Sequence, residues 1–201
     1  MPDALAASSA TSSFGFIAGD PALDFVNTVD WTDAGQVDER LTDYDALVRW
    51  SVEAGLLPGS TGDRLRRTAA ARPREARAAL ARAIRTRAVL HEVFSAVAGR
   101  RRPGTALREL NALVGNALGR LGLSDTLRWE WRDAGDRLDA VLWPVIRSAA
   151  ELLASSEAGQ IRVCGGPACG WMFVDRSRNG LRRWCQMRTC GTREKTRRRR
   201  V

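Results

Sequence analysis

The chain has 201 residues, of which 44% are hydrophobic, and a formal net charge of +9 at pH 7. No apolar run approaches the roughly 18 residues of a membrane-spanning helix, and the Ala- and Ser-rich start lacks the basic residues and apolar segment of a secretory signal. These features argue against a membrane or secreted protein. We expect a cytoplasmic protein with one modest core and a small accessory module.

The first half of the chain predicts helices of uneven clarity. Residues 1–13 are small and polar without periodicity, so we expect a disordered tail. Residues 23–31 are apolar and β-branched but are interrupted by Asp and Asn, a mixture that favours neither a helix nor a strand. One helix is expected to begin at a capping box formed by Thr42 and Asp45. A longer helix is expected to run from Pro73 to about residue 98.

The clearest amphipathic helix is expected over about 105–121. Its apolar stripe recurs at helical spacing and consists of Leu107, Leu110, Val114, Leu118 and Leu121. Alternating apolar and charged residues over 127–132 predict a half-buried strand, and an apolar face over 138–153 predicts a helix that Pro144 kinks or divides near Trp143. The predicted fold class is mainly α-helical with a small β component, in a helical domain over about 14–158.

Several polar side chains lie among the apolar residues of this domain, where buried polar groups need hydrogen-bond partners. Two interpretations stay open, because these side chains could line a ligand pocket or tie helix ends together. The candidates are Asp24, Asn27, Thr28 and Asn111, the last of which lies on the apolar stripe of the 105–121 helix. No P-loop, Gly-x-Ser-x-Gly or His-Glu-x-x-His motif is present, so the sequence indicates no familiar enzyme class.

All four cysteines of the chain lie within 27 residues, in the pattern C-x4-C-x15-C-x4-C. Two close pairs separated by a loop suit a tetrahedral zinc site, and a reducing compartment favours metal ligation over disulfides. The predicted ligands of one structural zinc are Cys164, Cys169, Cys185 and Cys190. Four thiolates close the coordination shell, which leaves no open position for catalysis.

The cysteines define a second domain, a zinc-ribbon-like finger over 161–201 that zinc is expected to fold. Residues 171–174 have strand character, and the turn signal Asn-Gly at 179–180 predicts that 181–184 return as the partner strand. The cationic residues over 193–200 are expected to form a helix. We also expect residues 14–158 to stay folded without the finger.

Charge divides the chain at the same boundary. Residues 161–201 carry 12 Lys+Arg and 2 Asp+Glu, a net charge of +10, whereas the rest has a net charge of −1. Arginine supplies every cation except Lys195, as expected of a GC-rich bacterial genome, so the clustering is the stronger signal. A cationic finger favours a nucleic-acid partner. The candidate contacts are Arg176, Arg178, Arg182, Arg183, Arg188, Arg193, Lys195 and Arg197.

The finger resembles the CGNR zinc finger in four motifs: Cys-Gly-Trp at 169–171, Asp-Arg-Ser-Arg-Asn at 175–179, Arg-Trp-Cys at 183–185 and Cys-Gly-Thr-Arg at 190–193. Upstream, Leu-Asp-Phe-Val-Asn-Thr at 23–28 resembles the opening of the ABATE domain. The resemblance implies a stress-induced transcriptional regulator whose finger binds DNA and whose ABATE domain senses a signal. Thr192 stands where the family's name motif has Asn, which leaves the zinc ligands untouched but alters a side chain that could cap a helix.

The leading hypothesis is therefore a DNA-binding transcriptional regulator, and not an enzyme, whose helical domain is a ligand sensor or a dimerisation module. A small-molecule ligand and a homo-oligomer are both compatible with the sequence. The first alternative is an RNA-binding or ribosome-associated zinc protein. The second is an enzyme with a site near Asp24 and Asn27 and a purely structural finger.

Overall fold

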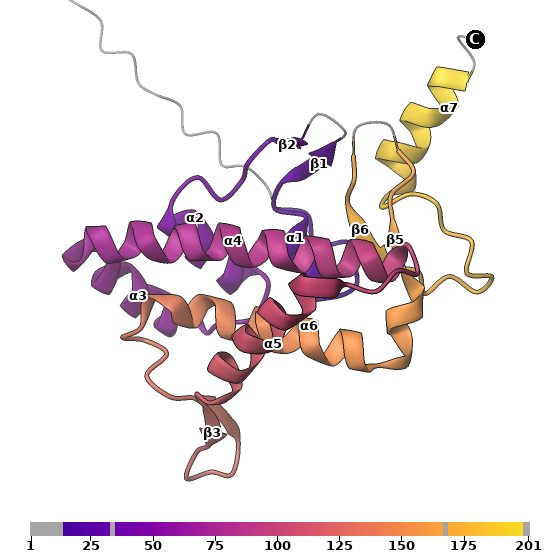
Figure 1. Cartoon of the computed structure of the whole chain (residues 1–201). Helices are drawn as coiled ribbons and strands as arrows, with labels where there is room; N and C mark the ends of the chain where they lie inside the picture. Colours follow the sequence, from indigo (N-terminus) through magenta and orange to yellow (C-terminus); the bar gives the residue numbers. More distant parts are fainter. Residues whose placement is uncertain (1–13, 33–34, 167–168, 199–201) are drawn as a thin grey trace, which may run out of the picture.

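The computed structural model describes residues 14–32, 35–166 and 169–198 (Figure 1). Seven α-helices, three short 3₁₀ or π helices and three two-stranded sheets lie in these ranges and confirm the predicted fold class. The disordered tail expected for 1–13 lies outside the described residues. No helix in the described part of the chain is both long and apolar enough to cross a bilayer.

The ambiguous segment over 23–31 divides into a helix and a strand. Helix α1 (Pro21–Val26) begins at Asp20, whose carboxylate accepts a hydrogen bond from Ala22 N at 2.8 Å. Strand β1 (Asp30–Thr32) then pairs antiparallel with β2 (Gly35–Val37). The mixed pattern arises because six residues of helix and three of strand are too short for either periodicity to show.

Helix α2 (Tyr44–Glu53) begins one residue away from the predicted capping box. The N-cap is Asp43, whose carboxylate accepts from Ala46 N at 2.7 Å, so the prediction of Thr42 and Asp45 as the box was wrong. Helix α3 (Gly59–Ala71) was not predicted, since Gly62 and Leu65 are its only buried residues.

Helix α4 (Pro73–Ala98) is the centre of the helical domain and confirms the prediction. Figure 1 shows it crossing the middle of the molecule, and α1, α2, α3 and α5 all pack against it. Leu90, Val93 and Phe94 are fully buried in the main core.

Helix α5 (Gly104–Leu118) is shorter than expected and turns a different face inward. It packs on α4 and α6 through Ala106, Leu110 and Ala117, whereas Leu107 and Leu118 are 39% and 41% exposed. The predicted stripe was therefore wrong except for Leu110 and the half-buried Val114, because the buried face of α5 consists of Ala106, Leu110 and Ala117.

A hairpin and two helices complete the domain. Strands β3 (Leu121–Leu123) and β4 (Trp129–Trp131) pair antiparallel, but Trp129 is 64% exposed, so the strand is less buried than predicted. The 3₁₀ helix η1 (Leu138–Leu142) meets helix α6 (Trp143–Ala154), which confirms the division predicted near Pro144. The 3₁₀ helix η2 (Ser156–Gln160) leads to the finger.

The finger consists of strands β5 (Ile161–Val163) and β6 (Met172–Val174), the π helix η3 (Met187–Gly191) and helix α7 (Thr192–Arg198). The strand predicted over 171–174 is present, but its antiparallel partner is β5 and not 181–184. Helix α7 matches the predicted cationic helix as far as 198, and 199–200 lie outside the described residues. In Figure 1, α7 points away from the helices, on the side opposite the β3–β4 hairpin.

Candidate metal centre and finger interface

The four predicted zinc ligands meet at one point. Cys164 follows β5 and Cys169 precedes β6, so one hairpin supplies the first pair, while Cys185 and the η3 residue Cys190 supply the second. All four side chains are buried, and their Sγ atoms lie within 4.8 Å of one another. The Sγ atom of Cys185 lies 3.7 Å from the Sγ atoms of Cys169 and Cys190. A tetrahedron with Zn–S bonds of about 2.3 Å has S···S edges of about 3.8 Å, so the cage fits zinc and is too wide for disulfides.

Backbone amides bind the sulfur of Cys164, but they are not enough to make all four cysteines thiolates. Cys164 Sγ accepts from Cys185 N at 3.3 Å and from Gly166 N at 3.4 Å. Hydrogen bonds from the thiols of Cys169 and Cys185, together with these amides, lower the pKa of Cys164. Hydrogen bonding to Cys164 in turn raises the pKa of Cys169 to about 12 and raises that of Cys185. A divalent cation is what allows all four to bind as thiolates.

Asn27 joins the helical domain to the strand beside the cage. It caps the end of α1, and its amide Nδ2 donates to Met172 O at 2.8 Å while its Oδ1 accepts from Met172 N at 2.9 Å. One side chain thus satisfies both backbone groups of a buried β6 residue, as a neighbouring strand would. Val174 N donates to Ala18 O at 2.8 Å and extends the same contact.

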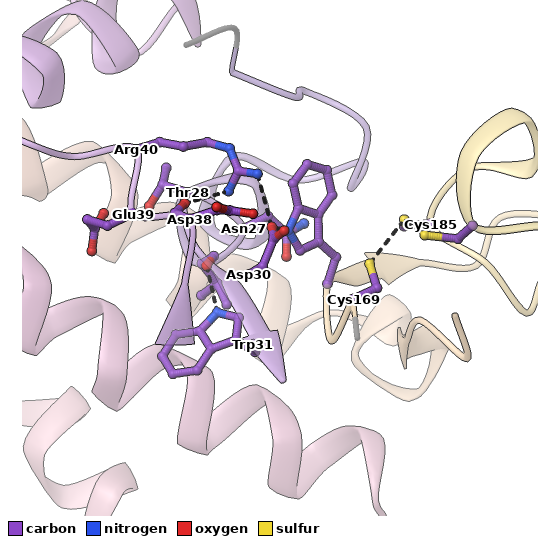
Figure 2. Close-up of polar contacts among 12 residues, drawn as sticks. Asn27, Thr28, Asp30, Trp31, Asp38, Glu39, Arg40, Cys169 and Cys185 are labelled. Atoms are coloured by element: carbon purple, nitrogen blue, oxygen red, sulfur yellow. Dashed lines mark hydrogen bonds and ion pairs between the residues drawn. The ribbon is translucent and has the colours of Figure 1, made fainter. Parts of the chain in front are cut away.

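Strand β1 makes the second contact, directly at a zinc ligand (Figure 2). Trp31 N donates to Cys169 O at 3.3 Å, and the indole Nε1 of Trp171 donates to Asp30 Oδ1 at 2.7 Å. Arg40 pairs with Asp30 at 3.0 Å and lies over the Trp171 ring at 5.3 Å. We call the residues Asn27, Asp30 and Trp31, with their partners Cys169, Trp171 and Met172, the finger interface.

Buried groups on α4 support this interface from behind. The Thr28 hydroxyl donates to Phe25 O and accepts from Arg87 Nη1, both at 2.8 Å. Arg87 is fully buried and holds both carboxylate oxygens of Glu39. One turn further along α4, His91 stacks flat on Trp31 with ring centroids 3.6 Å apart, and burial lowers its pKa to about 4, which keeps it neutral near pH 7.

The pocket prediction fares differently for its four residues. Asp24 Oδ1 accepts from Ile17 N at 3.0 Å and Ala18 N at 2.9 Å. Asp24, Asn27 and Thr28 therefore all form hydrogen bonds with backbone groups of the fold. Asn111 is exposed on α5, away from the buried face where the stripe had placed it, because that face is rotated. The structure does not bring Asn111 together with the other three.

The predicted nucleic-acid contacts divide into two groups. Arg176 pairs with Glu157 and donates to Gly19 O, and Arg182 donates to the carbonyls of Trp184 and Cys185 and stacks on Phe173 at 4.1 Å. Arg197 pairs with Glu194 on α7. Among the described residues, no carboxylate lies within ion-pair distance of the exposed cations Arg178, Arg183, Arg188, Arg193 and Lys195.

Sequence reasoning missed Trp31 as part of the finger interface, and it missed Arg87 and Glu39 as groups that support this interface. A buried arginine carries no distinctive sequence signal when it lies in a helix where arginines recur, and only the fold shows that Arg87 points inward. Glu39 lies between the expected elements, with no pattern to connect it with α4.

Comparison with known families finds two matches that cover nearly all of the described chain. The ABATE model, described as "Putative stress-induced transcription regulator", matches residues 19–156, and the CGNR zinc finger model matches residues 160–201. No curated protein matches the chain. The motif over 23–28 that resembled ABATE is the one that holds the finger, and the cysteine cage lies within the CGNR match. The chain therefore belongs to the ABATE family and carries a C-terminal CGNR zinc finger that holds one structural zinc.

Proposed function

We propose that this protein is a transcription regulator that binds DNA through its CGNR finger. The observation that carries the proposal is the position of these exposed cations relative to the zinc ligands. Arg183 precedes Cys185 by two residues, Arg188 lies between Cys185 and Cys190, and Arg193 follows Cys190 by three. Zinc holds their backbone in place, and a fixed, exposed cationic surface is what phosphate binding requires.

Arg178 lies in a turn that is also fixed from inside. The buried carboxylate of Asp175 accepts from Ser177 N and from Arg182 N, both at 3.0 Å, and closes the loop that carries Arg178. At the other end of the finger, the Thr192 hydroxyl donates to Met187 O at 3.2 Å, so Thr192 stabilises the junction of η3 and α7. Base contacts would then come from α7 side chains such as Arg193.

The helical domain is assigned the role of a sensor in this proposal. The finger interface connects the helical domain directly to the zinc site, because β1 contacts Cys169 and α4 supports β1 through Arg87 and His91. The backbone bonds of Asp24 and Asn27 favour this role over an enzyme with a site at those residues. Dimerisation stays a prediction from the sequence.

Selection of bound fragments tests the proposal against its RNA alternative. Full-length, zinc-loaded protein would be incubated with sheared genomic DNA and, separately, with a total RNA pool, and the retained fragments sequenced. Enrichment of a few promoter-proximal DNA sites is the expected result. Enrichment of RNA with no preferred DNA site would replace the proposal with the RNA-binding one.

A further inference from the structure

The helical domain contains a cavity that the finger interface does not use. Its volume is about 640 Å³, and it lies between α4, α5 and the η1–α6 segment. The apolar part of its wall is formed by Val89, Leu113, Leu142, Trp143 and Ile146. Pockets that hold small ligands measure about 300–1,000 Å³ and combine apolar walls with a few polar groups.

The polar part of the wall is cationic. Arg82 and Arg85 on α4, Arg120 after α5 and Arg137 before η1 line the cavity, opposed by Glu109 and Asp139, so the lining has a net charge of +2. Arg137 pairs with Asp139 at 3.4 Å. Within the described part of the chain, no carboxylate lies within ion-pair distance of Arg82, Arg85 or Arg120.

A hydroxyl group on the cavity wall adds an uncharged hydrogen-bond donor to these cations. Thr86 lies on α4 in the cavity wall and is only 3% exposed. Its hydroxyl makes no hydrogen bond with any described residue, so it is available to a ligand. A ligand with an acceptor atom would receive its hydrogen bond.

We propose that this cavity binds an organic anion with an apolar body, and this inference rests on the sensor role proposed above. The carboxylate, sulfonate or phosphate of the ligand binds Arg85 and Arg120 and accepts from the Thr86 hydroxyl. Its aromatic or acyl body lies on Trp143 and Leu113. Arginine suits this task, because its planar donors match such groups and stay charged at every physiological pH.

Helix α4 connects the cavity to the finger. Thr86 and Val89 face the cavity, whereas the neighbouring Arg87 and His91 hold Thr28 and Trp31 of the β1 region. A ligand that shifts this stretch of α4 changes the support of the strand that contacts Cys169. Occupancy and finger position are therefore coupled through one element.

A matched pair of fluorescent probes tests the proposal on the full-length, zinc-loaded chain. 8-Anilinonaphthalene-1-sulfonate is the anion, and N-phenyl-1-naphthylamine is the same molecule without its sulfonate. We expect one anionic probe per chain and at least about tenfold weaker binding of the neutral one, which is the discrimination that a charged hydrogen-bonding site supplies. Arg85→Gln with Arg120→Gln should weaken the anion about tenfold and leave the neutral probe unchanged, and Thr86→Val should weaken the anion severalfold.

Two further variants separate cavity binding from adsorption elsewhere. Ala112 lies exposed at the cavity wall, so Ala112→Trp should block both probes while the circular dichroism spectrum stays that of the wild type. Arg74→Gln with Arg77→Gln removes the same charge from α4 outside the cavity and should change neither affinity. Anion binding that is unaffected by Arg85→Gln with Arg120→Gln and by Ala112→Trp would overturn the inference. DNA affinity measured on the same proteins separates failure of this inference from failure of the proposed function. A protein that binds DNA but not the anion would reject the ligand cavity and leave the proposed DNA-binding function in place.

Discussion

Asn27 shows how a single side chain can replace a strand partner. Its amide bonds the N–H and the C=O of Met172, a residue of the finger 145 positions away in the sequence. The sequence indicated that Asn27 and its neighbours were polar groups in an apolar setting, and it left a pocket and a structural role open. The two roles differ in the hydrogen-bond partner of Asn27, and no local sequence pattern shows which distant backbone group a buried amide will bind.

Asn27→Ala tests this contact. It leaves two buried backbone groups of Met172 without partners, so the free energy of unfolding should fall by about 2–4 kcal/mol. Urea unfolding followed by circular dichroism measures the loss. Asn111→Ala is the matched control, because Asn111 is exposed, and it should change stability by less than about 0.5 kcal/mol. Equal effects of the two substitutions would contradict the assigned role of Asn27.

Asp24 predicts a dependence of stability on pH. Burial raises its pKa to about 6, against the lowering effect of the Ala18 and Ile17 amides. The folded state therefore binds its proton more tightly than the unfolded state, and Asp24 makes the protein less stable as the pH rises from about 4 to 6.

Asp24→Asn keeps Oδ1, which accepts both amides, and removes the buried charge. Above pH 6 we expect this variant to be more stable than the wild type, by on the order of 1–2 kcal/mol, and the difference should vanish below pH 4. Asp24→Ala loses the acceptor of both amides and should be less stable than the wild type at every pH. Urea midpoints between pH 4 and 8 decide the matter, and a wild type more stable than Asp24→Asn at pH 8 would refute it.

At the scale of elements, the sequence predicted structure where one strong local signal acts alone. The proline-led helix α4 and the division at Pro144 follow from local backbone chemistry, and both were found. The inward face of α5 and the partner of β6 depend on what each element meets. Leu110 shares the buried face of α5 with Ala106 and Ala117, and β6 pairs with β5, an arrangement that brings Cys164 and Cys169 together at the metal site.

Glycine substitutions test the contact between β1 and the finger. Gly170 has φ +63°, and a Cβ there would lie 1.8 Å from the carbonyl oxygen of Trp31, whereas Gly180 has the same φ and no neighbour within 4 Å. Gly180→Ala should cost only the left-handed strain of about 1 kcal/mol. Gly170→Ala must also push β1 from Cys169, so its melting temperature should fall much further. Similar melting temperatures for the two variants would exclude close docking of β1.

At the scale of the whole molecule, the helical domain and the finger share one core. Ile161, Met172 and Phe173 of the finger are fully buried in the same cluster as Phe25 and Leu90. The boundary drawn between 158 and 161 stays a prediction. Because of the shared core, we expect residues 14–158 alone to be less stable than they are in the whole chain. Removal of the finger would expose apolar surface on α1 and leave Asn27 without its partner Met172.

Loss of zinc should therefore destabilise the helical domain as well as the finger. Protein purified under reducing conditions should contain one zinc per chain, and Cys164→Ser should remove it and lower the melting temperature of the helical domain as well. Elemental analysis and thermal unfolding monitored at 222 nm provide the two measurements. A protein without zinc, or a helical transition unchanged by Cys164→Ser, would contradict this coupling.

The central claim is that the exposed cations near the zinc ligands bind DNA phosphates. Its most direct test is a salt titration of DNA affinity, by fluorescence anisotropy, on full-length zinc-loaded protein. Each lost phosphate contact should flatten the log–log slope by about one unit. The test variant replaces Arg178, Arg183 and Arg188 with Gln and spares Arg182, which supports the fold. The control makes the same change at the exposed helical-domain residues Arg74, Arg77 and Arg108. We predict a slope flatter by roughly two to three units for the finger variant and an unchanged slope for the control. Identical slopes for the wild type and the finger variant would contradict the account and leave the finger a structural module.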